Sequence, residues 1–129
     1  MTPPAPARTV LRRALLVALG GAIGTAARLA LGLAIPDAGG VPLSVLVANV
    51  LGALLIGLLA ARLPSSSDTR VFVGTGMLGG FTTYSALAVG TVELWHQAPL
   101  LAAGYAVVSV VLGIAAAALG LRLGRRSTT

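Results

Sequence analysis

The chain has 129 residues, of which 57% are hydrophobic and only 9% are charged, and its mean hydropathy is +0.97. This composition excludes an ordinary soluble domain, and the near absence of basic residues along any solvated face argues against nucleic-acid binding. With no cysteine, one histidine and three carboxylates, the chain offers no catalytic triad, carboxylate pair or histidine metal cluster, so we do not expect an enzyme.

Four apolar runs, each about 20 residues long, use nearly the whole sequence and predict an all-α membrane protein. The predicted transmembrane helices lie within one domain of residues 14–121 and cover residues 14–35, 43–61, 70–94 and 100–121. Residues 1–13 are rich in Pro and Ala and are predicted to form a disordered tail, and residues 122–129 a basic C-terminal tail.

The first run carries a charge inside an apolar helix. Gly20, Gly24 and Arg28 recur every four residues, so they share one face, on which the glycines permit close helix packing. An arginine at this depth either extends to the nearer membrane interface or faces an ion pathway. Both interpretations of Arg28 fit the sequence.

The second run follows a turn rich in Gly and Pro at residues 36–42. Within it, Asn49 lies on a face of small residues that includes Gly52, Ala53 and Gly57. An amide in a membrane helix either bonds a neighbouring helix or lines a path for an anion as a donor. We favour the second interpretation, because nothing else polar lies in the interior of this run.

The third run follows a polar loop in which Asp68 is predicted to cap the next helix. Four glycines in seven positions and then Phe-Thr-Thr-Tyr-Ser predict a helix that breaks over residues 79–83 and resumes. Unwound backbone is tolerated in a bilayer only where it is buried in protein or lines a watery path. Its freed carbonyls face cations and its helix N-termini face anions, so we expect an ion site here.

The fourth run begins at Pro99 and places Tyr105, Ser109 and Gly113 on one face of an otherwise apolar helix. Buried polar tips need partners, and structural hydrogen bonding and lining of a path explain this spacing equally well.

Arginines are distributed very unevenly among the segments that connect the apolar runs. Eight of the nine basic residues lie on the face of the termini and middle loop, and the other two loops contain none. The eight are Arg8, Arg12, Arg13, Arg62, Arg70, Arg122, Arg125 and Arg126. The positive-inside rule therefore predicts cytoplasmic termini in the cell membrane. Four small helices cannot readily shield a broken segment from lipid, so we also expect at least a dimer.

Taken together, these residues resemble the small fluoride channels of the Fluc family, also called CrcB, over about residues 15–121. The strongest match is Gly-Gly-Phe-Thr-Thr-Tyr-Ser at residues 79–85, which is similar to the family's broken-helix motif. Supporting matches are the glycines before Arg28, the pair Asn49 and Gly52, and the pair Tyr105 and Ser109. Four matches in order, in a chain of this length, make the resemblance specific.

The resemblance implies a passive fluoride channel built as an antiparallel dimer with two pores, with a structural sodium ion at its centre. The sodium ligands would be the backbone carbonyls of Gly79 and Thr82. The residues implied to line the fluoride path are Asn49, Tyr84, Ser85, Tyr105 and Ser109, with Arg28 at the vestibule. Donor groups and the positive edges of aromatic rings suit a small hydrated anion, and carbonyls suit a hard cation.

Two features depart from the family pattern or its usual symmetry. Tyr84 and Leu87 stand where the family usually has phenylalanines, and Leu87 offers no aromatic edge to an anion. The one-sided arginines also favour one-way insertion and pairing with a related, oppositely oriented chain, with the homodimer as the alternative.

Two rival functions fit the size of the chain. A small four-helix multidrug exporter would need a carboxylate in mid-membrane, and none of Asp37, Asp68 and Glu93 lies there. A non-transporting membrane scaffold would leave Asn49, Ser85 and the central break unexplained.

Overall fold

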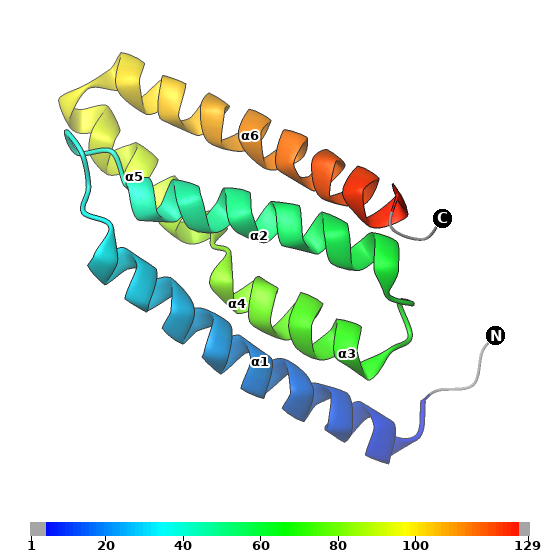
Figure 1. Cartoon of the computed structure of the whole chain (residues 1–129). Helices are drawn as coiled ribbons and strands as arrows, with labels where there is room; N and C mark the ends of the chain where they lie inside the picture. Colours follow the sequence, from blue (N-terminus) through cyan, green and yellow to red (C-terminus); the bar gives the residue numbers. More distant parts are fainter. Residues whose placement is uncertain (1–4, 127–129) are drawn as a thin grey trace.

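A computed structural model describes residues 5–126, and over these residues the chain is helical apart from short connections. Three helices in this part of the chain are long and apolar enough to cross a membrane: α1 (Ala7–Ala34), α2 (Leu43–Arg62) and α6 (Pro99–Arg126). Between α2 and α6, four shorter segments follow one another in a bent line (Figure 1). They are α3 (Asp68–Arg70), the π-helix η1 (Val71–Leu78), α4 (Gly79–Phe81) and α5 (Tyr84–Gln97).

The helices extend further than the apolar runs predicted. Helix α1 begins at Ala7, inside the stretch predicted as a disordered tail, so that prediction is corrected for residues 7–13. Helix α6 continues to Arg126, five residues beyond the predicted end of its span. Ala, Leu and Arg are strong helix formers, so these helices continue past the apolar residues. Residues 1–4 and 127–129 of the predicted tails lie outside the described residues.

The closest packing is found in two places. Helix α1 packs on η1 and α4, and helix α2 packs on α6. Glycines set both contacts: a Cβ atom added at Gly24 would overlap the backbone carbonyl of Met77, and one at Gly120 would overlap that of Leu54. Helix α5 then packs on α6, where Leu94 and Ala102 are buried. The faces predicted from Gly20 and Gly24 on α1 and from Gly52 and Gly57 on α2 are therefore packing faces, whereas a Cβ at Gly113 of α6 would meet nothing within 4 Å.

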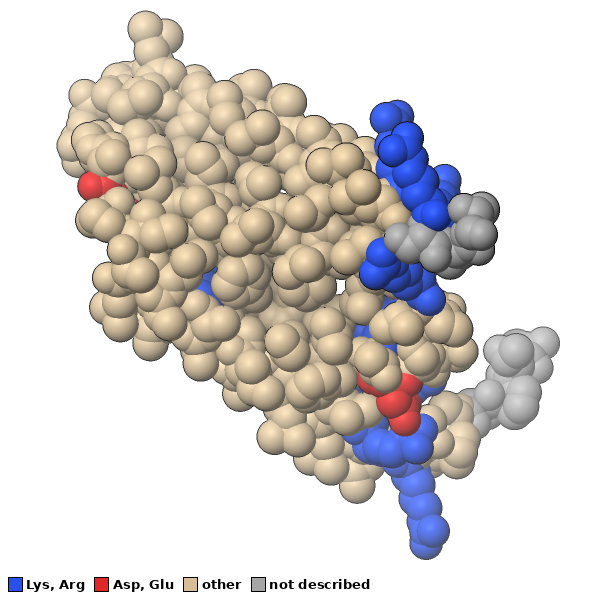
Figure 2. Space-filling view, in the orientation of Figure 1, with Lys and Arg blue, Asp and Glu red and all other residues tan. Residues whose placement is uncertain are grey.

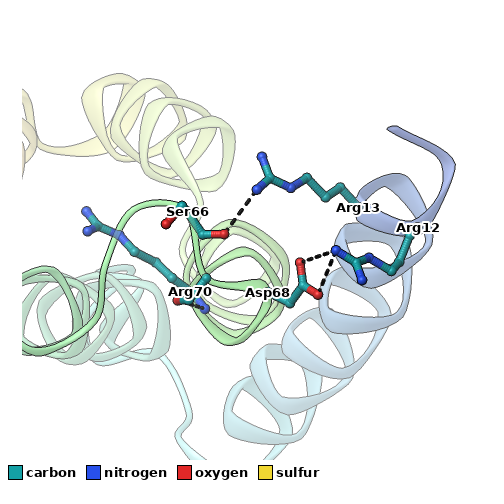
Figure 3. A network of polar contacts seen from close by, with 6 residues as sticks. Arg12, Arg13, Ser66, Asp68 and Arg70 are labelled. Carbon is teal, nitrogen blue, oxygen red and sulfur yellow. Dashed lines mark hydrogen bonds and ion pairs between the residues drawn. The ribbon is translucent and has the colours of Figure 1, made fainter. Parts of the chain in front are cut away.

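A polar network joins the start of α1 to the loop before α3 (Figure 3). Arg12 Nη2 lies 3.1 Å from Asp68 Oδ2, an exposed ion pair. The side chain of Ser67 accepts a hydrogen bond from the Arg70 N–H at 3.2 Å and so caps the helix. The predicted capping role of Asp68 is wrong: Ser67 occupies the N-cap, and Asp68 is paired with Arg12 instead.

Both termini and the α2–α3 loop lie at one end of the molecule, and the other two connections lie at the opposite end (Figure 1). The turn between α1 and α2 is closed by backbone hydrogen bonds between Ala38 and Val41, with Gly39 and Gly40 at positive φ of 60° and 81°. Arginines gather at the end that carries the termini (Figure 2). The fold thus brings together the basic segments that the sequence placed on one face.

Candidate functional site

The third segment is interrupted at two residues. Thr82 has φ −78° and ψ 156°, and Thr83 has φ −153° and ψ 116°, both extended, whereas Gly79 is still helical with φ −63° and ψ −37°. The predicted break is confirmed, but its predicted bounds of 79–83 are too wide. Gly80 stays in α4 because it packs directly on the backbone of Gly21 in α1, where a side chain would not fit.

The segment leading to the break is wider than an α-helix. Over Val71–Leu78 the chain forms a π-helix, and the N–H of Gly79 reaches back to the carbonyl of Gly74, five residues earlier. π-helical turns are rare and are frequent at functional sites. This π-helix was not predicted from the sequence. The only signal for it was the cluster of glycines, which also fits other kinds of irregular backbone.

Asn49 holds the break through two hydrogen bonds to one residue. Its Oδ1 accepts from the N–H of Thr83 at 2.7 Å, and its Nδ2 donates to the carbonyl of Thr83 at 3.0 Å. In a continuous helix the Thr83 N–H would donate to the Gly79 carbonyl, which therefore loses its helical donor here. Since an amide nitrogen carries two hydrogens, Asn49 keeps a second N–H for another acceptor.

Thr82 and Thr83 are each tied down locally as well. The hydroxyl of Thr82 donates to the carbonyl of Leu78 at 2.9 Å, and its methyl group fills the space that a Cβ of Gly52 would need. Thr83 is the N-cap of α5, and its hydroxyl oxygen accepts from the N–H of Ala86 at 3.2 Å. Asn49 and Gly52, three residues apart on α2, are thus the residues against which the break packs.

A groove of about 320 Å³ lies beside the break. Its lining consists of residues from α2 and from both sides of the break: Asn49, Ala53, Ile56, Thr82, Thr83, Tyr84 and Leu87. Tyr84 is 82% exposed. Ser85 lies next to the groove and shares a hydrogen bond of 3.2 Å with the hydroxyl of Thr83. The structure therefore brings Asn49, Tyr84 and Ser85 together around a polar discontinuity in an apolar protein.

Arg28 reaches the break from the other side. Its Nε donates to the carbonyl of Gly80 at 3.3 Å, and the hydroxyl of Thr25 lies 3.4 Å from the same oxygen. Arg28 and Thr25 also line a separate hollow of about 460 Å³ with Ser44. The guanidinium is thus directed at the broken segment of the same protomer, and its vestibule role stays a prediction.

Tyr105 and Ser109 lie elsewhere in this protomer. Both are buried, and neither lines the groove beside the break. The Tyr105 hydroxyl donates to the carbonyl of Pro42 at 3.4 Å, and the Ser109 hydroxyl donates to the carbonyl of Tyr105 at 2.6 Å. Their contacts are structural within one chain, and their role in a fluoride path stays a prediction.

Comparison with known proteins places this geometry in a family. The family model described as CrcB-like protein, Camphor Resistance (CrcB), matches residues 15–121. The chain belongs to the CrcB family. The match has the same limits as the resemblance seen in the sequence, and it includes the break, Asn49 and Arg28.

Curated relatives of this chain include proteins named fluoride-specific ion channel FluC. The protein of that name from Paracoccus denitrificans is 48% identical over 113 residues, 84% of this chain and 91% of its own length. The one from Agrobacterium fabrum is 44% identical over 120 residues, 85% and 94% of the two chains. A third, FluC 1 from Mycobacterium bovis, is 45% identical over 113 residues, 83% and 86%. These relatives are named as ion channels and not as enzymes.

Thr83 is a central residue of the break that was not predicted from the sequence as a site residue. Its backbone N–H and carbonyl are the groups that Asn49 binds, and its hydroxyl caps α5. A threonine placed directly before a resumed apolar helix is a helix N-cap signal, and that signal was available in the sequence. The link to Asn49, 34 residues away, was not.

Proposed function

We infer that this chain is a fluoride-specific ion channel of the cell membrane. The support comes from relatives of that name that match most of its length and from one structural observation. That observation is the pair of hydrogen bonds by which Asn49 holds the backbone of Thr83 in an extended conformation beside a groove. A partly buried break held in this way presents donors and carbonyls inside an apolar protein, as an ion path needs.

The few donors in and beside this mostly apolar groove suit a small anion. A path for fluoride has to replace its water, and N–H and O–H donors can do so. The second amide hydrogen of Asn49 and the hydroxyls of Tyr84 and Ser85 are such donors. Tyr105 and Ser109 would extend the path once a second subunit is present, and Arg28 would raise the local anion concentration at the vestibule. The membrane potential drives an anion outward by about 2.3 kcal/mol per 100 mV, so export needs no coupled energy source.

A structural sodium ion is part of the proposal, held by the carbonyls of Gly79 and Thr82. Among residues 5–126, no group of three or more His, Cys, Asp or Glu could hold a metal, so the candidate ligands at the break are backbone oxygens. The Gly79 carbonyl fits this role because its helical donor is bound to Asn49. Hard oxygen ligands suit sodium, and a fixed cation would lower the cost of bringing fluoride into the membrane interior.

The assembly we propose is an antiparallel dimer of four-span subunits, in which the broken segment is the third span and the termini are cytoplasmic. Tyr84 lines the groove beside the break and is 82% exposed, and this exposure supports the presence of a second subunit over this face. The partner we favour is a related chain of opposite orientation, because the arginines of this chain lie at one end (Figure 2). The homodimer is the alternative.

Orientation can be tested cleanly because the chain has no cysteine. Ser65→Cys and Ala38→Cys place single thiols in exposed loops at opposite ends. One-way insertion predicts that a membrane-impermeant maleimide added to intact cells labels Ala38→Cys and not Ser65→Cys. Equal labelling of both would show two orientations and would support the homodimer.

The function itself is tested by ion release from liposomes. The purified channel is reconstituted in vesicles loaded with potassium fluoride. Valinomycin then makes the vesicles permeable to potassium, and an electrode records fluoride release. We expect fast fluoride release and none of chloride from matched potassium chloride vesicles. Equal release of both anions would contradict a fluoride-specific channel, and release without valinomycin would contradict passive electrical transport.

A further inference from the structure

A second groove lies between α2 and η1, away from the break. Its volume is about 340 Å³, within the range of about 300–1,000 Å³ for ligand-binding clefts. The lining is almost wholly apolar and includes Leu55, Leu59, Val73 and Met77. Arg62 is the one charged residue in it. The groove exists because α2 and η1 make few contacts with each other, while each packs closely on a different helix.

This groove faces away from the surface assigned to the second subunit. At 3.6 residues per turn, Asn49, Ala53 and Ile56 share one side of α2 beside the break, whereas Leu55 and Arg62 lie on roughly the opposite side. A partner that covers Tyr84 would therefore leave the groove between α2 and η1 facing the bilayer. Leu55 is 43% exposed there.

The charges around the groove are one-sided. Arg62 lies at the end of α2, in the part of the molecule where the arginines gather (Figure 2). Helix α6 brings more of them close, because Gly124 packs against Ala61 and is followed by Arg125 and Arg126. Asp68, which is paired with Arg12, is the only acidic residue of the α2–α3 loop and α3. A phosphate group would be attracted to this end.

We propose that the groove binds an anionic phospholipid of the cytoplasmic leaflet. One acyl chain lies along Leu55, Leu59 and Met77, and the headgroup phosphate accepts hydrogen bonds from Arg62. Leu55 is seven residues before Arg62 on the same side of α2, so the groove runs about 10 Å into the membrane from the headgroup. A guanidinium suits this role because its fork of N–H donors matches the oxygens of a phosphate.

Fluorescence quenching can test the site without any fluoride measurement. Trp95 is the only tryptophan, so Leu55→Trp in a Trp95→Phe background reports on the groove alone. The protein is reconstituted in phosphatidylcholine containing increasing amounts of either dibrominated phosphatidylglycerol or dibrominated phosphatidylcholine. One basic residue at an anionic surface should favour phosphatidylglycerol about fivefold. Adding Arg62→Gln should remove this preference, and Arg62→Lys should keep most of it.

Two matched controls separate the groove from general surface charge. Arg122→Gln removes an arginine at the same end that does not line the groove, and the preference should be unchanged. Leu119→Trp, at an exposed position of α6, should show no preference. Equal quenching by both lipids at Leu55→Trp would overturn the proposal, as would an equal loss in Arg122→Gln. Absence of quenching by either lipid would also overturn it, because the groove would then be covered by protein.

Discussion

Removing the amide of Asn49 should release the break. Asn49→Ala deletes both hydrogen bonds to Thr83, at 2.7 and 3.0 Å, and leaves a partly buried N–H and carbonyl without those partners. Two bonds at about 0.6–1 kcal/mol each, the range between measured membrane averages and soluble proteins, give a loss of about 1–2 kcal/mol. A loss of this size changes an equilibrium by about 5- to 30-fold. It should both destabilise the protein and displace the groove residues that a transported anion must pass.

Both effects are measured on one protein preparation. Stability is read from helix loss in mixed micelles with increasing dodecyl sulfate, and transport from fluoride release by liposomes. The matched control is Thr91→Ala, because the Thr91 hydroxyl donates only to Leu87 of its own helix, at 2.7 Å, and such bonds add little to stability. If Asn49→Ala unfolds like the unmodified protein and releases fluoride at the same rate, our account of the break is wrong.

Three further substitutions test separate parts of the structure. Gly24→Ala should lower the unfolding free energy by about 1–3 kcal/mol in the same micelle assay, because the added Cβ would overlap neighbouring backbone. The control is Gly104→Ala, which should be neutral or stabilising because its added Cβ would have nothing within 4 Å. Asp68→Asn removes the exposed ion pair with Arg12, so it should lower stability by less than about 1 kcal/mol and have no effect in high salt; a larger loss would contradict this. Leu87→Phe adds an aromatic edge to the groove and should increase fluoride release, and an unchanged rate would show that the ring has no role there.

The existence of the long helices could be predicted because apolar length indicates a membrane span, but their ends could not, since α1 begins at Ala7 and α6 continues to Arg126. The break was also predicted, but its position depended on packing. Four glycines indicated unwinding at residues 79–83, yet close contact between Gly80 and Gly21 keeps α4 helical, and the chain becomes extended only at Thr82 and Thr83. The cost of a glycine in a helix is about 1 kcal/mol, which backbone packing of this kind outweighs.

The polar residues of the site were predictable by type and not by partner. Asn49 and Arg28 could be identified as candidates because polar groups inside a membrane helix are costly and indicate a partner or a function. The sequence could not show that Asn49 binds the backbone of Thr83, or that Arg28 binds the carbonyl of Gly80, because both contacts join distant segments. Periodicity also placed Tyr105 and Ser109 on a polar face, but tertiary packing buries that face against α2 and α5 within one chain.

The most direct test of the proposed channel compares this chain purified alone with this chain purified together with an oppositely oriented relative from the same cell. Each preparation is placed in liposomes loaded with potassium fluoride, and fluoride release is recorded after addition of valinomycin. Our account predicts release from the pair and little from the chain alone. Equal release by the chain alone would contradict the pairing, and the absence of release from both would contradict the fluoride channel itself.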